Sequence, residues 1–241
     1  MFRRSWRESD RHRHRNAGPP HPDDPEAPER LRDSIASEPH LGGGAEQQRL
    51  AWFAAKRQGN SLLGDILTHV GAGLLGGIFA VAGAFIVHLV VPIDSGWGWL
   101  NSLVFGPVVE ELLKASGALY LLEKKPYRLH SGIALAAVVV CSALVFSVCE
   151  NLLYVHVYVD VAHLKDPIGY VLFRWVAPTG MHLVCSAVAS LGLIHIWRTQ
   201  TQTGKYLDLD AAYPHFAAAM ALHCLYNLFA LLFDGLLFPR A

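Results

Sequence analysis

Two glutamates and a lysine interrupt an otherwise apolar stretch of the chain. Glu110, Glu111 and Lys114 lie within the run from residue 97 to residue 122, which is long enough to cross a bilayer as a helix. Glu110 and Lys114 are four residues apart, so they share a helix face and can pair. A charge at bilayer depth is costly, so it usually faces the protein interior or a wet cavity and serves a function. The structural alternative is a buried ion pair through which helices recognise one another.

Polar side chains with a four-residue spacing also occur in three later apolar stretches. Residues four apart lie on one face of a helix, and at ~1.5 Å per residue these groups reach depths of roughly 14–20 Å, similar to that of Glu111. Similar depth favours one shared site over scattered structural residues. A carboxylate can take a proton from water, and a histidine, amide or cation can stabilise an oxyanion, so the set suits hydrolysis. In chain order the groups are Phe146, Glu150 and Tyr154; Arg174, Pro178 and His182; and His223 and Asn227.

The composition places these residues in a membrane protein. The 241 residues are 52% hydrophobic, and residues 1–60 hold 20 of the 40 charged residues, so the remainder is strongly apolar. The formal net charge is zero, which gives no case for a nucleic-acid partner. The four cysteines lie inside apolar runs, where they are typical packing residues and form neither a disulfide framework nor a metal motif.

Two regions follow from this distribution. Residues 1–58 form a polar cytoplasmic tail, which we expect to be disordered up to about residue 45 and to end in a short helix over 45–58 at the membrane surface. Residues 59–241 form the transmembrane domain. The predicted fold is all-α, a polytopic membrane helix bundle of about five transmembrane helices in contact with lipid. The expected spans are Ile66–Val91, Gly98–Leu122, Ser131–Val159, Gly169–Trp197 and Tyr213–Phe233.

The distribution of Lys and Arg among the loops predicts an orientation in the cell membrane. Basic residues are more frequent in cytoplasmic loops. This rule places the N-terminus in the cytoplasm and the C-terminus outside. The basic groups expected on the cytoplasmic side are Lys56 and Arg57; Lys124, Lys125 and Arg128; and Arg198 and Lys205.

The four polar groups, in this order on successive spans, resemble the PrsW family of bacterial intramembrane proteases. That family is similar to the CAAX prenyl endopeptidases and to the scaffold subunit of gamma-secretase. The resemblance covers roughly residues 60–238 and rests on Glu110-Glu111-x-x-Lys114 together with the three later motifs. It implies a membrane endopeptidase that cuts membrane-anchored proteins such as anti-sigma factors. A proton-coupled transporter and an inactive scaffold that binds transmembrane segments are the alternatives.

The roles expected for a peptidase follow from the chemistry of each group. Either Glu110 or Glu111 acts as general base on a water molecule, and His182 orients that water. His223 and Asn227 donate hydrogen bonds to the oxyanion. Supporting roles in holding and tuning the carboxylates fall to Lys114, Glu150, Tyr154 and Arg174.

The family resemblance and the residue chemistry give different expectations for a bound metal. Members of the family have been described as metalloproteases, and Glu150, His182 and His223 would supply a zinc set with a position left for water. Lys114 and Arg174, however, would place positive charge close to a dication. The sequence therefore favours a glutamate-type protease without a cofactor, with a zinc enzyme as the alternative.

Overall fold

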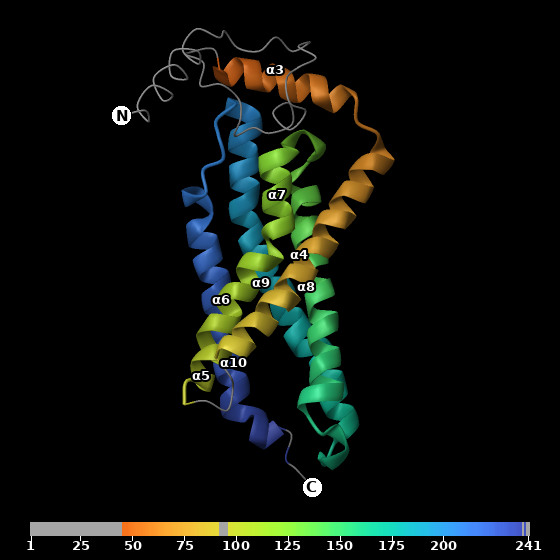
Figure 1. Ribbon diagram of the computed structural model, residues 1–241, viewed down its shortest axis with the longest axis vertical. Helices are drawn as coiled ribbons and strands as arrows, with labels where there is room; N and C mark the ends of the chain where they lie inside the picture. The colour runs from red at the N-terminus through yellow and green to blue at the C-terminus, as the bar shows by residue number, and fades with distance from the viewer. Residues whose placement is uncertain (1–44, 92–95, 238, 240–241) are drawn as a thin grey trace, which may run out of the picture.

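The computed structural model describes residues 45–91, 96–237 and 239, and every regular element among them is helical (Figure 1). This confirms the all-α prediction. The expected disordered segment before residue 45 lies outside the described residues. In chain order the elements are α3 (Ala45–Gln58), α4 (Leu62–Val90), α5 (Gly98–Leu100), η2 (Asn101–Phe105), α6 (Gly106–Lys114), α7 (Ser116–Lys124), η3 (Pro126–Arg128), α8 (Gly132–Leu153), η4 (Tyr154–Tyr158), η5 (Val161–His163), α9 (Pro167–Thr203), η6 (Asp210–Ala212) and α10 (Tyr213–Leu237).

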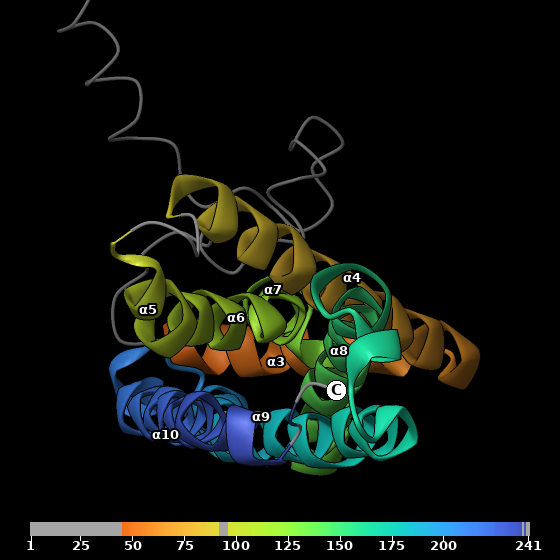
Figure 2. The same cartoon turned by 90° about the horizontal axis from the view of Figure 1, so that it is seen from below.

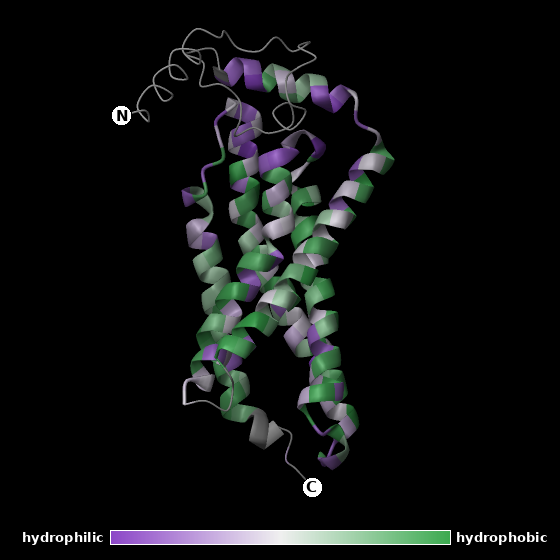
Figure 3. Ribbon diagram, viewed as in Figure 1, coloured by the Kyte–Doolittle hydropathy of each residue, from purple (hydrophilic) through white to green (hydrophobic). Residues whose placement is uncertain are grey.

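Four helical stretches are long and apolar enough to cross a membrane. They comprise α4, α8 with η4, α9, and α10 with the preceding turn. Figure 3 shows apolar residues over the length of these helices and a concentration of polar residues at the end where α3 lies. Many of their large apolar side chains are exposed, such as Leu75, Val176 and Leu232, as expected for a surface that contacts lipid.

The second expected span, Gly98–Leu122, is not one continuous helix. It consists of α5, the π-helical turn η2, α6 and α7, with a break at Ala115. Pro107 lies in the first turn of α6, where its missing N–H is tolerated and a new helix begins. The segment nevertheless runs between the two ends of the bundle beside the long helices (Figure 1). The break divides the polar α6 from the more apolar α7.

Glycines allow α4 to approach its neighbours closely. A Cβ atom at Gly77 would lie 2.6 Å from Cβ of Val145 on α8, and one at Gly117 of α7 would collide with the carbonyl of Ala72. The spacing of Gly73 and Gly77 predicts such an approach, and the structure confirms it. Seen from the end opposite α3 (Figure 2), α4, α8, α9, α10 and α6 follow one another around a ring in which neighbours pack together.

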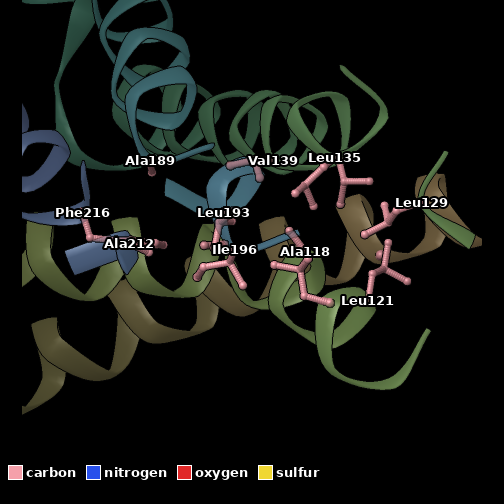
Figure 4. Close-up of a cluster of buried hydrophobic side chains, with 14 of the residues drawn as sticks. Ala118, Leu121, Leu129, Leu135, Val139, Ala189, Leu193, Ile196, Ala212 and Phe216 are labelled. Carbon is pink, nitrogen blue, oxygen red and sulfur yellow. The ribbon is translucent and has the colours of Figure 1, made fainter. Parts of the chain in front are cut away.

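The apolar core lies at the end of the bundle that α3 covers. Leu121 of α7, Leu135 and Val139 of α8, and Leu193 and Ile196 of α9 are fully buried and meet there (Figure 4). This core fixes the relative positions of α7, α8 and α9 on one side of the polar residues described below.

Helix α3 occupies the segment for which the sequence predicts a short helix, and it is tied to the loop after α7. Arg57 donates to the carbonyl of Leu129 at 3.1 Å, and Asn60 donates to that of Tyr127 at 3.3 Å. The contact brings the basic residues of α3 and of η3 to the same end of the bundle.

The close approach of α4 and α7 gives a stability prediction. Gly117→Ala should destabilise the protein by about 1–3 kcal/mol, because the added methyl group meets the backbone of Ala72, which cannot move aside cheaply. Gly71→Ala is the matched control, because no atom lies within 4 Å of its added Cβ; it should be neutral or slightly stabilising. Thermal unfolding in detergent measures both, and equal midpoints for the two variants would contradict the packing described.

Candidate functional site

Seven of the predicted site residues gather in the middle of the bundle from four helices. The carboxylates and the lysine of α6 are buried, as are His182 of α9 and His223 of α10. Hydrogen bonds and ion pairs connect all of them, so the similar depths expected from the sequence do correspond to one cluster. The seven residues are Glu110, Glu111, Lys114, Glu150, Arg174, His182 and His223.

The ammonium group of Lys114 joins two halves of this cluster. Its Nζ atom donates to Oε1 of Glu111 at 2.6 Å and to Nδ1 of His182 at 3.0 Å. The same Glu111 oxygen accepts from Nδ1 of His223 at 2.8 Å. The pair of Glu110 with Lys114 that the spacing permits does not form: the lysine pairs with Glu111, three residues away, and the same carboxylate accepts a hydrogen bond from His223.

These partners fix the hydrogen positions on both imidazole rings. A lysine can only donate, so Nδ1 of His182 accepts, and its Nε2–H donates to Oε2 of Glu150 at 3.0 Å. In His223, Nδ1–H donates to Glu111, which leaves Nε2 without a hydrogen in the neutral ring. That nitrogen lies 3.7 Å from Oε2 of Glu110.

Glu150 is held from the other side by Arg174. Nη2 of Arg174 lies 3.2 Å from Oε2 of Glu150, and the guanidinium carbon lies 3.8 Å from the ring centre of Tyr154. Stacking on an aromatic face while pairing with a carboxylate is a favourable use of arginine. The structure thus places Arg174 beside Glu150 and Tyr154 against Arg174; their supporting role stays a prediction.

Among the described residues, a group of donor atoms that could hold a metal ion includes Glu110 rather than Glu150. Glu110, His182 and His223 each offer a donor atom, and the three atoms lie within 4.8 Å of one another. Glu110 takes the place predicted for Glu150, because Glu150 is turned towards His182 and Arg174. Oε2 of Glu110 is buried and has no hydrogen-bond partner among the described residues.

Asn227 lies apart from this network. Its Nδ2 donates to the carbonyl of Ser102 at 2.8 Å, which ties α10 to η2. The side chain lines the cavity described next, but within the described residues it makes no hydrogen bond to a histidine or carboxylate of the cluster. Its expected role at an oxyanion stays a prediction.

A cavity of about 480 Å³ opens beside the cluster. Glu110, Glu150, Arg174 and His182 line it, whereas Glu111 lies behind Glu110 and is 1% exposed. The two adjacent glutamates are therefore distinct: Glu110 can contact a molecule in the cavity, and Glu111 can hold His223.

Tyr226 is a cavity residue that sequence reasoning missed. It lines the cavity, and its hydroxyl is buried with no hydrogen-bond partner among the residues described. It follows His223 by three residues, a spacing that places both on one helix face, so the signal was present in the sequence.

The buried lysine gives a second prediction. Lys114→Met should destabilise the protein by about 3–5 kcal/mol, because it leaves the Glu111 carboxylate charged and buried without its cation. Lys124→Met removes an exposed pair with Glu123 and should change stability by less than about 1 kcal/mol. Thermal unfolding in detergent tests the pair of variants. Recovery of stability in Lys114→Met/Glu111→Gln would show that the unpaired charge is the cause, and an unchanged midpoint in Lys114→Met would contradict the network.

No curated protein and no solved structure match this chain. The family model described as PrsW family intramembrane metalloprotease matches residues 66–239, which include every residue of the cluster and all four membrane-span helices almost completely. The match agrees with the family resemblance seen in the motifs. The chain therefore belongs to the PrsW family of intramembrane metalloproteases and is a multi-pass membrane peptidase.

Proposed function

We propose that this peptidase cuts membrane-anchored proteins in the cavity beside Glu110, and that Glu110, His182 and His223 hold a divalent cation such as zinc there. One observation carries the proposal. Oε2 of Glu110 and Nε2 of His223 lie 3.7 Å apart, and in the neutral ring, whose Nδ1–H donates to Glu111, both atoms are acceptors. Two buried acceptors at this distance repel each other unless a cation, a proton or a hydrogen-bond donor lies between them, and a cation offsets the carboxylate charge as well.

The charges around the site support a cation. Lys114 neutralises Glu111, and Arg174 neutralises Glu150. Among the described residues Glu110 has no lysine or arginine within ion-pair distance, so one negative charge of the cluster stays unmatched by a fixed cation. The two cations that the sequence sets against a metal are thus each paired with another carboxylate. Two histidines and a carboxylate also form a known donor set for catalytic zinc.

The metal, when bound, would polarise a peptide carbonyl and activate a water molecule. Glu111 would keep Nε2 of His223 directed at the cavity by accepting the hydrogen of Nδ1, a carboxylate–histidine arrangement common behind metal ligands. Lys114 holds Glu111 and His182 at a fixed separation.

Glu150 is the remaining carboxylate that lines the cavity, and we assign it the acceptance of a proton from the attacking water. Arg174 holds Glu150 in place through their ion pair, and the Tyr154 ring packs against the guanidinium group of Arg174. From the sequence, Glu110 is a candidate general base and Glu150 a candidate zinc ligand, and this proposal reverses those two roles.

A metal-free route is the second candidate, and a specific observation favours it. Both nitrogens of His182 already have protein partners, Lys114 at 3.0 Å and Glu150 at 3.0 Å, so a metal would have to displace one of them. In this route Glu110 takes the proton of the water directly, and Glu111 orients His223. Both routes place Glu110 at the reacting centre and Glu111 behind it.

The substrates we propose are proteins anchored by a single apolar segment, with anti-sigma factors as the class expected from the family resemblance. A peptide bond presented in a buried cavity must come from a chain that already resides in or beside the membrane. Comparison of membrane-protein fragments from cells with the wild-type chain and with Glu110→Gln identifies them, because substrate fragments should be lost in the variant.

We also propose that the end of the bundle carrying α3 faces the cytoplasm, with the protein in the cell membrane. The support is the gathering of Arg57 and Arg128 at this end, which follows the preference of basic residues for cytoplasmic loops. A cysteine placed at Lys125 should react with an impermeant reagent only from the cytoplasm, and one placed at Asp166 only from outside. The reverse labelling pattern would overturn the orientation.

The central test measures metal and cleavage in the same preparations. Wild-type protein in detergent should carry about one zinc per chain and cleave a model single-pass substrate, and Glu110→Gln and His223→Ala should lose both properties. Glu111→Gln should weaken metal affinity by about 10–100-fold, because it orients a ligand and does not bind the ion. His195→Ala is the control, since His195 is an exposed residue of α9 outside the cluster, and it should retain both.

The outcomes separate the candidate mechanisms. Loss of cleavage on chelation, with recovery on return of zinc, supports the metal route. Cleavage that persists in metal-free protein but is lost in Glu110→Gln would establish the glutamate route. Failure of the wild-type protein to cut any membrane-anchored substrate would overturn the proposed function.

A further inference from the structure

Helix α4 leaves α8 on the side of the bundle where the cavity lies. The two helices touch at Gly73 and Gly77, where an added Cβ would meet Cys141 and Val145. Six residues later Gly83 packs on Val109 of α6 instead. Figure 1 shows α4 crossing α8 near mid-length and diverging from it towards the end opposite α3. The C-terminal half of α4 and the end of α8 thus border a gap that side chains must fill.

The side chains at this gap are walls of the cavity. The rings of His88 on α4 and Tyr158 on η4 approach each other with centroids 6.0 Å apart and planes inclined by 34°. Both rings are partly exposed, so they are also part of the outer surface. The cavity residues contributed here are Val81, Ala84, Phe85 and His88 from α4, and Tyr154 and Tyr158 from η4.

We propose that the apolar transmembrane segment of the substrate reaches the cavity sideways from the lipid, between the C-terminal half of α4 and η4, with the His88–Tyr158 contact as the part that moves. The inference rests on the proposed function. It adds where on the molecule the substrate docks and which residues it meets first.

The contact between His88 and Tyr158 is one that can open without moving a helix. It joins two side chains, and an aromatic contact of this kind contributes only about 0.5–1.5 kcal/mol. Tyr158 belongs to a π-helical turn, a less regular backbone that is common at functional sites. Rotation of the two side chains therefore uncovers the cavity at small cost.

On the opposite side, a backbone hydrogen bond links the loop before α9 to the chain after α10. The amide of Lys165, just before α9, donates to the carbonyl of Pro239, just after α10, at 3.1 Å. Asn227 also ties α10 to η2 through the Ser102 carbonyl. A substrate that came from this side would have to break these hydrogen bonds, whereas at the α4 side the link we describe is a contact between two aromatic side chains, so we favour the α4 side.

The rim of the gap fits an apolar segment. Phe85 is 49% exposed and Val157 is 67% exposed, and the chain from residue 66 to residue 91 contains no Asp, Glu, Lys or Arg. The charged residues Glu110, Glu150 and Arg174 lie deeper in the cavity. A charged peptide would thus lose its hydration at the rim without a partner, whereas an apolar one would exchange lipid for protein contact.

The depth of the site sets how much of the substrate must unwind. Eight residues separate Glu150 from Tyr158, which corresponds to roughly 12 Å along a helix. An extended chain covers this distance with about four residues. A helix with its side chains is about 10–12 Å wide, so the substrate helix docks at the rim and a short extended stretch passes to the carboxylates.

Two phenylalanines of α4 allow a matched test. Phe85 borders the cavity and is 49% exposed, whereas Phe79 is 51% exposed on the same helix and does not border it. A photo-crosslinking phenylalanine analogue placed at residue 85 should form an adduct with a model single-pass substrate, in both the wild-type background and Glu110→Gln. The same analogue at residue 79 should give no adduct above background. A third position, Leu231 of α10, is 58% exposed and borders the cavity on the opposite side.

The results distinguish failure of this inference from failure of the proposed function. Adduct at residue 85 that exceeds those at 79 and 231 supports access beside α4. Adduct mainly at 231, or equal adducts at 79 and 85, would overturn it while wild-type cleavage of the same substrate leaves the peptidase intact. Absence of cleavage by the wild-type protein would instead count against the function itself.

Discussion

The buried ammonium group of Lys114 is the interaction on which the rest of the site depends. It is fully enclosed, and its hydrogen bonds to Glu111 and His182 join residues of α6 and α9 that lie 68 or more positions apart in the chain. A charge in this environment is stable only with an opposite charge and well-placed acceptors. Because Lys114 can only donate, it fixes which nitrogen of His182 carries hydrogen, and through Glu111 it fixes His223 as well. The positions of α6, α9 and α10 around the cavity are thus coupled to one amine.

The fold supplies this arrangement by separating apolar packing from polar chemistry. Leu121, Leu135 and Leu193 fill the interior at the end covered by α3, where α7, α8 and α9 meet. The glycines of α4 then permit a close crossing, beyond which α4 turns to α6 and leaves space next to the carboxylates. A tight core at one end and a cavity at the other are what a bundle needs if it is to admit water and a peptide without losing its structure.

Much of the site could be predicted from sequence because membrane burial makes polar residues informative. Charged groups in apolar helices need partners, so Glu150, Arg174 and His182 could be assigned to one cluster from depth and spacing alone. The pairing could not be predicted, because both glutamates are within reach of Lys114. The spacing permits a pair with Glu110, but in the structure Lys114 and His223 both bond Oε1 of Glu111. The broken helix before Ser116 also escaped prediction, since a long apolar average conceals a π-helical turn and a proline-initiated start.

The consecutive glutamates show how one helix turn can provide two functions. Glu110 and Glu111 differ by about 100° around the axis of α6, enough to direct one carboxylate at the cavity and the other at Lys114 and His223. The inner carboxylate has its charge matched and is fixed by hydrogen bonds. Oε2 of Glu110 has no hydrogen-bond partner among the described residues. It lies near Nε2 of His223, the ring that Glu111 holds in place. Two acceptors that face each other are unfavourable without a donor or a cation between them, so the pair favours binding of a cation or a proton. The adjacency of the two residues has a direct meaning in the proposed function: one glutamate orients the histidine beside which the other would act.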